Sequence, residues 1–167
     1  MTITVPFVPT PYEVVKETLK IAGLKSNEYL LDLGCGDGRV LIIGAEDFGA
    51  KAVGIETRSD LVLKAALSVM RAHLTDRVLI IQGDFFKLNL SFADVVFMYL
   101  LSSVNEKLRP KLESELKTGA RVVSHDFEVR GWKPASKHIV RDGYREHQIY
   151  LYVKGWSEQD EGGRSTR

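Results

Sequence analysis

The sequence predicts a single α/β domain built on a doubly wound, mostly parallel sheet of seven strands with a C-terminal antiparallel hairpin. Short apolar runs alternate with longer amphipathic stretches between residues 29 and 124, as expected when crossover helices join parallel strands. The last two apolar runs flank Asp142-Gly143, a turn pair that joins antiparallel neighbours. A chain of 167 residues holds one such domain and is too short for two of ordinary size.

The chain opens with an extended segment, residues 1–10, in which two prolines remove backbone donors and disfavour a helix. A helix is expected next, because Thr10-Pro11-Tyr12-Glu13 has the pattern of a capping box with proline at the first helical position. We place the domain at residues 1–154 and expect the polar residues 155–167 to form a disordered tail.

The seven strands are expected at residues 29–33, 52–55, 78–81, 94–98, 120–124, 139–141 and 147–153. Further helices are expected at residues 37–48, 59–72 and 104–116. The last of these begins with a second capping box, Ser103 with Glu106. Residues 82–93 leave room only for a loop or one helical turn between the third and fourth strands.

Composition narrows the class of protein. The 23 basic and 22 acidic residues leave a net charge of +1, which disfavours a protein that coats nucleic acid or an acidic membrane. The single cysteine, Cys35, excludes an internal disulfide, and the four histidines show no metal-ligand spacing. The first residues lack the pattern of a secretory signal, and the longest apolar run, residues 95–101, is too short to span a bilayer. We therefore expect a cytoplasmic monomer with no metal, no membrane contact and no specific nucleic-acid partner.

The most informative segment is Leu31–Arg39, in which a strand leads directly into Gly34, Gly36 and Gly38 and then into a helix. Ligands of open parallel sheets bind beyond the carboxyl ends of the strands, and glycines let a ligand approach the backbone closely. A tight turn alone needs fewer glycines. We interpret the segment as a ligand site.

Two carboxylates flank this loop, because Asp32 ends the strand and Asp37 begins the helix. They would repel the pyrophosphate of a dinucleotide, and the third glycine of the NAD fingerprint is replaced by Arg39. S-adenosylmethionine has no phosphate and carries a sulfonium and an ammonium. We expect Asp32 to accept a hydrogen bond from that ammonium, and the loop amides to donate to the methionine carboxylate.

Two further acids follow the next strands. Glu56 is expected to accept from both ribose hydroxyls, and Asp84 to accept from the adenine amino group, with Phe85 or Ile55 as an apolar wall. A helix cap and a core side chain are the plainer interpretations of Asp84 and Phe85. The expected cofactor-binding residues are Thr10, Asp32, Gly34, Cys35, Gly36, Asp37, Glu56, Gly83, Asp84 and Phe85.

Over residues 11–153 this pattern resembles the class I, seven-strand S-adenosylmethionine-dependent methyltransferases. Three segments are similar to a narrower group, the small archaeal broad-specificity protein lysine methyltransferases and the mitochondrial lysine methyltransferases of the ATP synthase c-subunit. They are VPFVPTP (5–11), GDFFK (83–87) and RVVSHDF (121–127) followed by Gly131-Trp132. A weaker likeness extends to the histone lysine methyltransferase that lacks a SET domain. The resemblance implies a Rossmann-like fold, S-adenosylmethionine as cofactor and a broad range of lysine-bearing proteins as substrates.

The acceptor is expected to meet the residues after the fourth strand, which read FMYLLSS (97–103). This segment lacks the Asn-Pro-Pro-Tyr motif with which this superfamily holds adenine and glutamine amino groups, so those acceptors are disfavoured. Tyr99 is the candidate catalytic residue, since its ring can wall a lysine channel and its hydroxyl can contact the amine; packing in the core is the alternative. By resemblance, the N-terminal segment would cross the cofactor and Thr10 would touch it.

Other candidates and functions stay open. His125 is a possible proton acceptor, although a hydrogen-bonded structural histidine is favoured, and no neighbouring histidine suggests that Cys35 is a nucleophile. A methyltransferase acting on a small molecule or on RNA would share the cofactor site. A non-catalytic domain that only binds the cofactor is the third interpretation.

Overall fold

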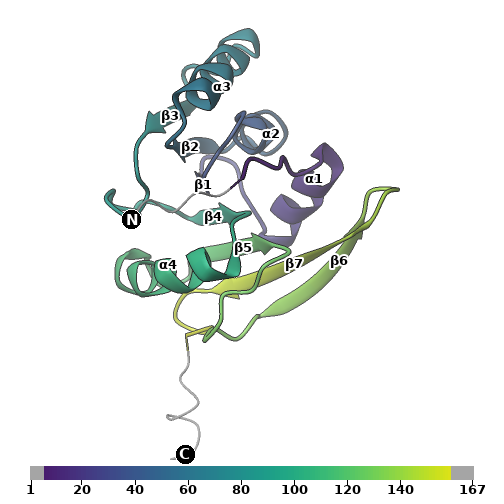
Figure 1. Cartoon of the computed structure of the whole chain (residues 1–167), viewed down its shortest axis with the longest axis vertical. Helices are drawn as coiled ribbons and strands as arrows, with labels where there is room; N and C mark the ends of the chain where they lie inside the picture. Colours follow the sequence, from purple (N-terminus) through teal and green to yellow (C-terminus); the bar gives the residue numbers. More distant parts are fainter. Residues whose placement is uncertain (1–5, 159–167) are drawn as a thin grey trace, which may run out of the picture.

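The structure is a computed structural model that describes residues 6–158. It contains one seven-stranded sheet in the order β3-β2-β1-β4-β5-β7-β6, with helices on both faces (Figure 1). The strands are β1 (Tyr29–Leu33), β2 (Lys51–Glu56), β3 (Val78–Gln82), β4 (Val95–Met98), β5 (Arg121–His125), β6 (Ser136–Arg141) and β7 (Glu146–Val153). The helices are α1 (Tyr12–Ile21), α2 (Arg39–Phe48), α3 (Ser59–Arg71) and α4 (Ser102–Glu115).

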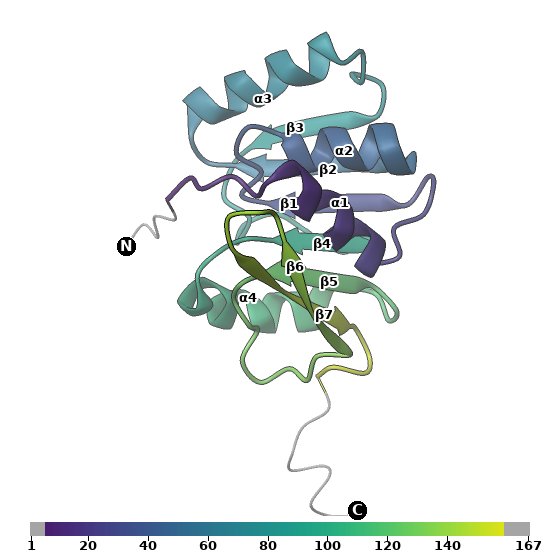
Figure 2. The ribbon, with the colours of Figure 1, turned by 90° about the vertical axis from the view of Figure 1, so that its right-hand side faces the viewer.

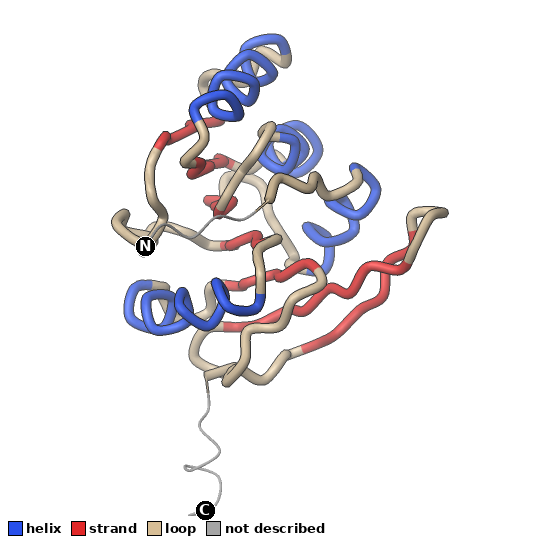
Figure 3. Tube along the Cα trace, viewed as in Figure 1, coloured by secondary structure: helices blue, strands red, loops and turns tan. Residues whose placement is uncertain are grey.

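The predicted topology is confirmed. Strands β3, β2, β1, β4 and β5 pair in parallel, and β7 pairs antiparallel with both β5 and β6. Most element bounds shift by one or two residues, and β6 begins three residues earlier than expected. The connection from β3 to β4 contains neither helix nor strand, so it crosses the sheet as a loop, tan in Figure 3.

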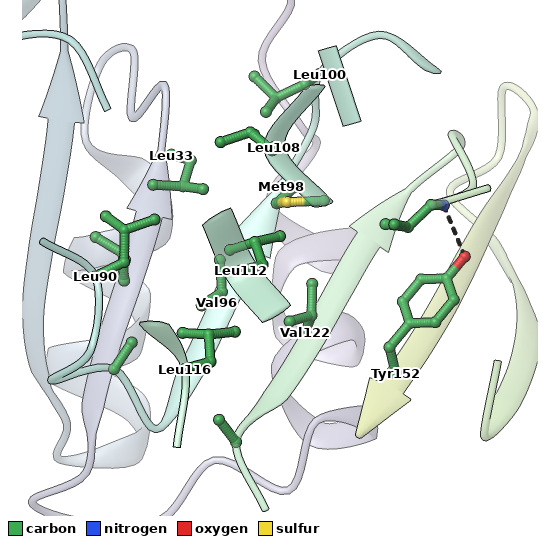
Figure 4. Close-up of a cluster of buried hydrophobic side chains, with 14 of the residues drawn as sticks. Leu33, Leu90, Val96, Met98, Leu100, Leu108, Leu112, Leu116, Val122 and Tyr152 are labelled. Carbon is green, nitrogen blue, oxygen red and sulfur yellow. Dashed lines mark hydrogen bonds between the residues drawn. The ribbon is translucent and has the colours of Figure 1, made fainter. Parts of the chain in front are cut away.

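The central strands are buried because helices cover both faces of the sheet. Every residue of β4 is buried, which explains its continuous apolar run. On one face α1 and α2 pack against the sheet, and on the other α4 contributes Leu108 and Leu112 to a cluster that includes Val96 and Met98 (Figure 4). Apolar burial on both faces thus holds the sheet rigid beneath the edge where its parallel strands end.

Both predicted capping boxes are wrong. Helix α1 begins after Pro11 without a side-chain cap, because the hydroxyl of Thr10 is bonded to His125 instead. Helix α4 begins at Ser102, one residue before the expected cap, and it has no side-chain cap either. In each case the sequence pattern of a capping box is present, and at α1 the hydroxyl that would cap the helix is hydrogen-bonded to a residue distant in the chain.

Part of the predicted tail packs against the domain. Ser157 is buried; its hydroxyl accepts a hydrogen bond from the Val153 amide and its carbonyl accepts one from the Lys133 amide. Residues 159–167 lie outside the described residues, as do the first five of the predicted N-terminal segment. None of the helices between residues 6 and 158 combines the length and the apolar character that crossing a bilayer requires.

Candidate active site

A cavity of about 660 Å³ opens at the carboxyl ends of β1, β2 and β4, next to the point where the strand order reverses. In Figure 2 this edge of the sheet faces left, where residues 6–10 cross it. The cavity wall includes every predicted site residue, namely Thr10, Asp32, Gly34, Cys35, Gly36, Asp37, Glu56, Gly83, Asp84, Phe85 and Tyr99. Residues that the sequence patterns did not predict line the same wall, among them Thr57, Arg58 and Leu61. Thr57 and Arg58 directly follow the acid that ends β2, and Leu61 lies in the first turn of α3; this closeness to Glu56 is the signal that could have found them.

The glycine loop after β1 requires its glycines. Gly34, Gly36 and Gly38 have φ values of 77°, 54° and 83°, in the left-handed region that other residues avoid. A side chain at Gly36 would also collide with the ring of Phe7, so this glycine makes room for the N-terminal segment to pack on the loop. The loop and the segment above it therefore fit together as one wall of the cavity.

Asp32 is a buried carboxylate without a cationic partner among residues 6–158. Its exposed fraction is 4%, and burial, followed by the charges of Glu56 and Asp37, raises its pKa to about 8. An anion in this position is costly until a cation neutralises it. The site therefore fits a ligand with an ammonium and a sulfonium, and it disfavours one with phosphates.

The other two carboxylates are already engaged. Glu56 accepts the Gly36 amide on Oε1 and the Arg58 amide on Oε2, both at 3.0 Å, so only its remaining lone pairs face ribose hydroxyls. Arg39 lies 2.7 Å from Asp37; although burial alone would raise the pKa of Asp37, the bonds and charge of Arg39 lower it. Arg39 also donates to the Thr10 carbonyl. The residue that replaces the third glycine therefore ties the loop to the N-terminal segment, a role that the sequence did not reveal.

Asp84 and Phe85 combine the two interpretations offered for them. Asp84 Oδ1 accepts the Phe86 amide at 2.9 Å, which closes its own turn, and both Asp84 and Phe85 line the cavity. The rings of Phe85 and Phe86 lie 5.1 Å apart. A contact between Asp84 and an adenine amino group stays a prediction.

Tyr99 follows β4 directly and lines the cavity. Its hydroxyl is 3.4 Å from Asp126 Oδ2 and 3.3 Å from Arg145 Nη2, and its ring packs against His125 with centroids 3.8 Å apart and the planes tilted by 30°. Burial, and then the charge of Asp126, raises the pKa of Tyr99, so the phenol stays protonated at neutral pH. The ring is held rigidly and still contributes to the cavity wall.

Cys35 is not poised for nucleophilic chemistry. It is buried, and burial together with the charges of Asp32 and Glu56 raises the pKa of its thiol. A reactive cysteine needs the opposite shift, because the thiolate is the nucleophile. The role of Cys35 in the wall is therefore one of size and shape.

Comparison with known sequences gives a family. The model of the ANTKMT methyltransferase domain matches residues 32–136. A protein-lysine N-methyltransferase of Saccharolobus islandicus (strain REY15A) is 49% identical over 90% of this chain and 94% of that protein. The adenine nucleotide translocase lysine N-methyltransferase of Mus musculus is 33% identical over 84% of this chain, which spans only 60% of that relative.

Comparison with solved structures agrees. The crystal structure of an RNA methyltransferase from Salinibacter ruber in complex with S-adenosyl-L-homocysteine has a TM-score of 0.81 and 43% identity, covering 87% of this chain and 93% of that one. With the predicted resemblance confirmed and the buried Asp32 suited to a cationic nucleoside, the chain belongs to the ANTKMT methyltransferase domain family and uses S-adenosylmethionine as its methyl donor.

Proposed function

We propose that this protein methylates the side-chain amines of lysines in proteins and accepts a broad range of protein substrates. The observation that carries the proposal is the 49% identity to the Saccharolobus protein-lysine N-methyltransferase over nearly the whole length of both chains. S-adenosylmethionine supplies an electrophilic methyl group on a positively charged sulfur. The task left to the protein is to align an uncharged amine with that group and to exclude water.

The residues around the cavity suit this task. Asp32 and the glycine loop would hold the amino-acid part of the donor, and Glu56 the ribose. Phe7 and its neighbours in the N-terminal segment form an apolar cover on the loop, which favours the neutral amine over the ammonium. The face of Tyr99 can attract the cationic methylated product.

A broad substrate range is supported by the small size of the domain. The sheet, its four helices and the loops that connect them account for nearly all of residues 6–158, so the described chain contains no separate domain for substrate recognition. An acceptor lysine would then be recognised by its own side chain and its immediate surroundings. This arrangement admits many exposed lysines.

The test is to incubate the protein with methyl-labelled S-adenosylmethionine and a cell lysate, then to treat samples with protease or nuclease. We expect label in several unrelated protein bands, sensitive to protease and recovered as methyl-lysine by mass spectrometry. The matched control is the Asp32→Asn variant, which should incorporate no label. Label confined to one protein would contradict the broad range.

RNA is the second candidate substrate, because the similar Salinibacter structure is described as that of an RNA methyltransferase. Against it, the net charge of this chain is +1 and the segment after β4 lacks Asn-Pro-Pro-Tyr. Label removed by nuclease and not by protease would replace lysine with RNA as the acceptor.

Removal of the Tyr99 hydroxyl tests the acceptor side of the cavity. Tyr99→Phe keeps the ring and its packing against His125, and we expect kcat to fall about 5- to 10-fold, the effect of one hydrogen bond. The dissociation constant of S-adenosylhomocysteine, measured by calorimetry, should be unchanged. Tyr29→Phe, at the far end of β1, is the control; equal rates for the two variants would remove the hydroxyl from the reaction.

A further inference from the structure

A line of hydrogen bonds leaves the cavity at Thr10 and ends in the turn of the β6–β7 hairpin. Thr10 Oγ1 lies 2.9 Å from His125 Nδ1, His125 Nε2 lies 2.7 Å from His147 Nδ1, and His147 Nε2 lies 2.8 Å from Asp142 Oδ2. Both histidines are buried, with exposed fractions of 0% and 1%, and Thr10 lines the cavity. The line therefore connects the site to a turn through the interior of the protein.

The directions of these bonds are coupled. A carboxylate only accepts, so His147 must carry a proton on Nε2, and the carboxylate of Asp126, 3.5 Å from His125 Nε2, favours His125 as the donor to His147 Nδ1. His125 donates to that nitrogen from Nε2, which leaves its own Nδ1 bare. The Thr10 hydroxyl must donate to His125 Nδ1, and its oxygen is left as an acceptor toward the cavity.

The surroundings favour this set of protons. Asp126 Oδ2 lies 3.5 Å from His125 Nε2 and stabilises a proton there, while Arg145 pairs with the same oxygen at 2.8 Å. Burial lowers the pKa of His125 to about 4, which keeps the ring neutral at physiological pH. The amides of Tyr144 and Arg145, and then His147, lower the pKa of Asp142, which keeps it ionised.

His125, His147 and Asp126 also have the composition of a metal site, since their ligand atoms lie within 4.8 Å of one another. The two imidazole nitrogens are 2.7 Å apart, a hydrogen-bond separation that is shorter than two ligands of one tetrahedral ion adopt. Asp126 is paired with Arg145. This geometry points to a hydrogen-bond network.

We propose that Thr10, His125, His147 and Asp142 form a positioning network that holds the Thr10 hydroxyl as a hydrogen-bond acceptor for an N–H group of a ligand in the cavity. Two ligands carry such a group: the ammonium of S-adenosylmethionine and the amine of the acceptor lysine. An oxygen that accepts from an amine N–H orients the nitrogen and leaves its lone pair free to react. The alternative in which Thr10 accepts from the acceptor lysine rests on the proposed function. The direction of the hydrogen bonds in the network does not.

Asp142→Asn tests the direction with a change of one atom. The asparagine Oδ1 can still accept the amides of Tyr144 and Arg145, as Asp142 Oδ1 does, so the turn is kept. Its Nδ2 replaces Oδ2 and only donates, so His147 Nε2 must lose its proton. Every later bond then reverses, and the Thr10 proton turns toward the cavity.

The readout is the ¹⁵N NMR spectrum of the histidine rings in the ligand-free protein. We expect His125 and His147 to carry their protons on Nε2 in the wild type and on Nδ1 in Asp142→Asn. The chain has four histidines, so Gln variants of His73 and His138 complete the assignment. Asp76→Asn, an exposed acid between α3 and β3, is the control and should leave both tautomers unchanged. An unchanged His125 tautomer in Asp142→Asn would overturn the network.

Binding and turnover then identify the ligand group. If Thr10 meets the acceptor amine, Asp142→Asn should lower kcat on a lysine peptide about 10-fold with the affinity for S-adenosylhomocysteine unchanged. If Thr10 meets the donor ammonium, that affinity should fall about 10-fold instead. Thr10→Val should reproduce whichever effect is found, and Thr18→Val, a buried threonine bonded within α1, should not. If Asp142→Asn changes neither kcat nor the affinity, the proposal is overturned. If the wild-type protein shows the expected tautomers but does not methylate lysine, only the proposed function is contradicted.

Discussion

Replacing Asp32 by asparagine is expected to weaken the binding of S-adenosylmethionine strongly while making the free protein more stable. The variant keeps the shape of the side chain and removes the charge that would pair with the ammonium, so the affinity should fall about 100-fold or more. In the free protein the same charge is buried without a cation among residues 6–158, and its removal relieves that cost. Calorimetry with S-adenosylhomocysteine measures the first effect and thermal unfolding at pH 8 the second.

The gain in stability depends on pH. The pKa of Asp32 is about 8 in the folded protein, against an ordinary value of 3.8, so the folded state holds a proton that the unfolded state releases between these values. The stability of the wild type that derives from this proton is present below pH 4 and is lost as the pH rises through 8. A pKa difference of about four units corresponds to about 5 kcal/mol, so at pH 8 the variant should be more stable by several kcal/mol, or about 10–20 °C in Tm.

Plots of Tm against pH for the wild type and for Asp32→Asn should therefore coincide near pH 4 and separate toward pH 8. Asp37 and Glu56 are present in both proteins, so the difference between the curves isolates Asp32. Asp76→Asn serves as the control for a general loss of negative charge. If the difference in Tm between the two proteins is the same from pH 4 to pH 8, then Asp32 is ionised in the free protein and its charge is already neutralised there. Binding by the wild type should in turn strengthen as the pH rises to 8, because the ligand pairs with the ionised form.

The fold was predictable because its signals are local and repeated. Each buried parallel strand is a continuous apolar run, and each crossover helix shows its own periodicity, so the order of elements could be read from the sequence. The site followed from one topological rule. Parallel strands end at the same edge, and the acids in the last residues of β1 and β2 and just after β3 must therefore converge on one cavity.

The contacts that could not be predicted from the sequence are those between residues far apart in the chain. Thr10 has a clear local reason to cap α1, yet it bonds to His125, 115 residues away. Arg39 was only the residue that breaks a glycine fingerprint, and its bonds to Asp37 and to the Thr10 carbonyl depend on where the N-terminal segment crosses the loop. A side chain with a clear local pattern can still bond to a residue far away in the chain, and sequence spacing does not predict such a partner.

Replacing Glu56 by glutamine is expected to weaken both the glycine loop and the binding of the donor. Glu56 accepts one backbone amide on each carboxylate oxygen, from Gly36 and from Arg58. The side-chain amide of glutamine has only one oxygen, so its NH2 group must face one of these two backbone N–H groups. That N–H loses its acceptor, at a cost of about 1–3 kcal/mol. The affinity for S-adenosylhomocysteine should fall about 10- to 100-fold, since the loop amides and the ribose acceptor are disturbed together. Glu106→Gln, an exposed acid on α4, is the control.

The Glu56→Gln and Asp32→Asn substitutions should interact in a double-mutant cycle. The charge of Glu56 helps to raise the pKa of Asp32, so Glu56→Gln relieves some of the repulsion in the wild type and offsets part of its own cost. In the Asp32→Asn background no repulsion remains to be relieved. We therefore expect Glu56→Gln to lower the free energy of unfolding more in that background than in the wild type at pH 8, and equally in both at pH 4. Strict additivity at pH 8 would mean that the two carboxylates do not share an electrostatic site.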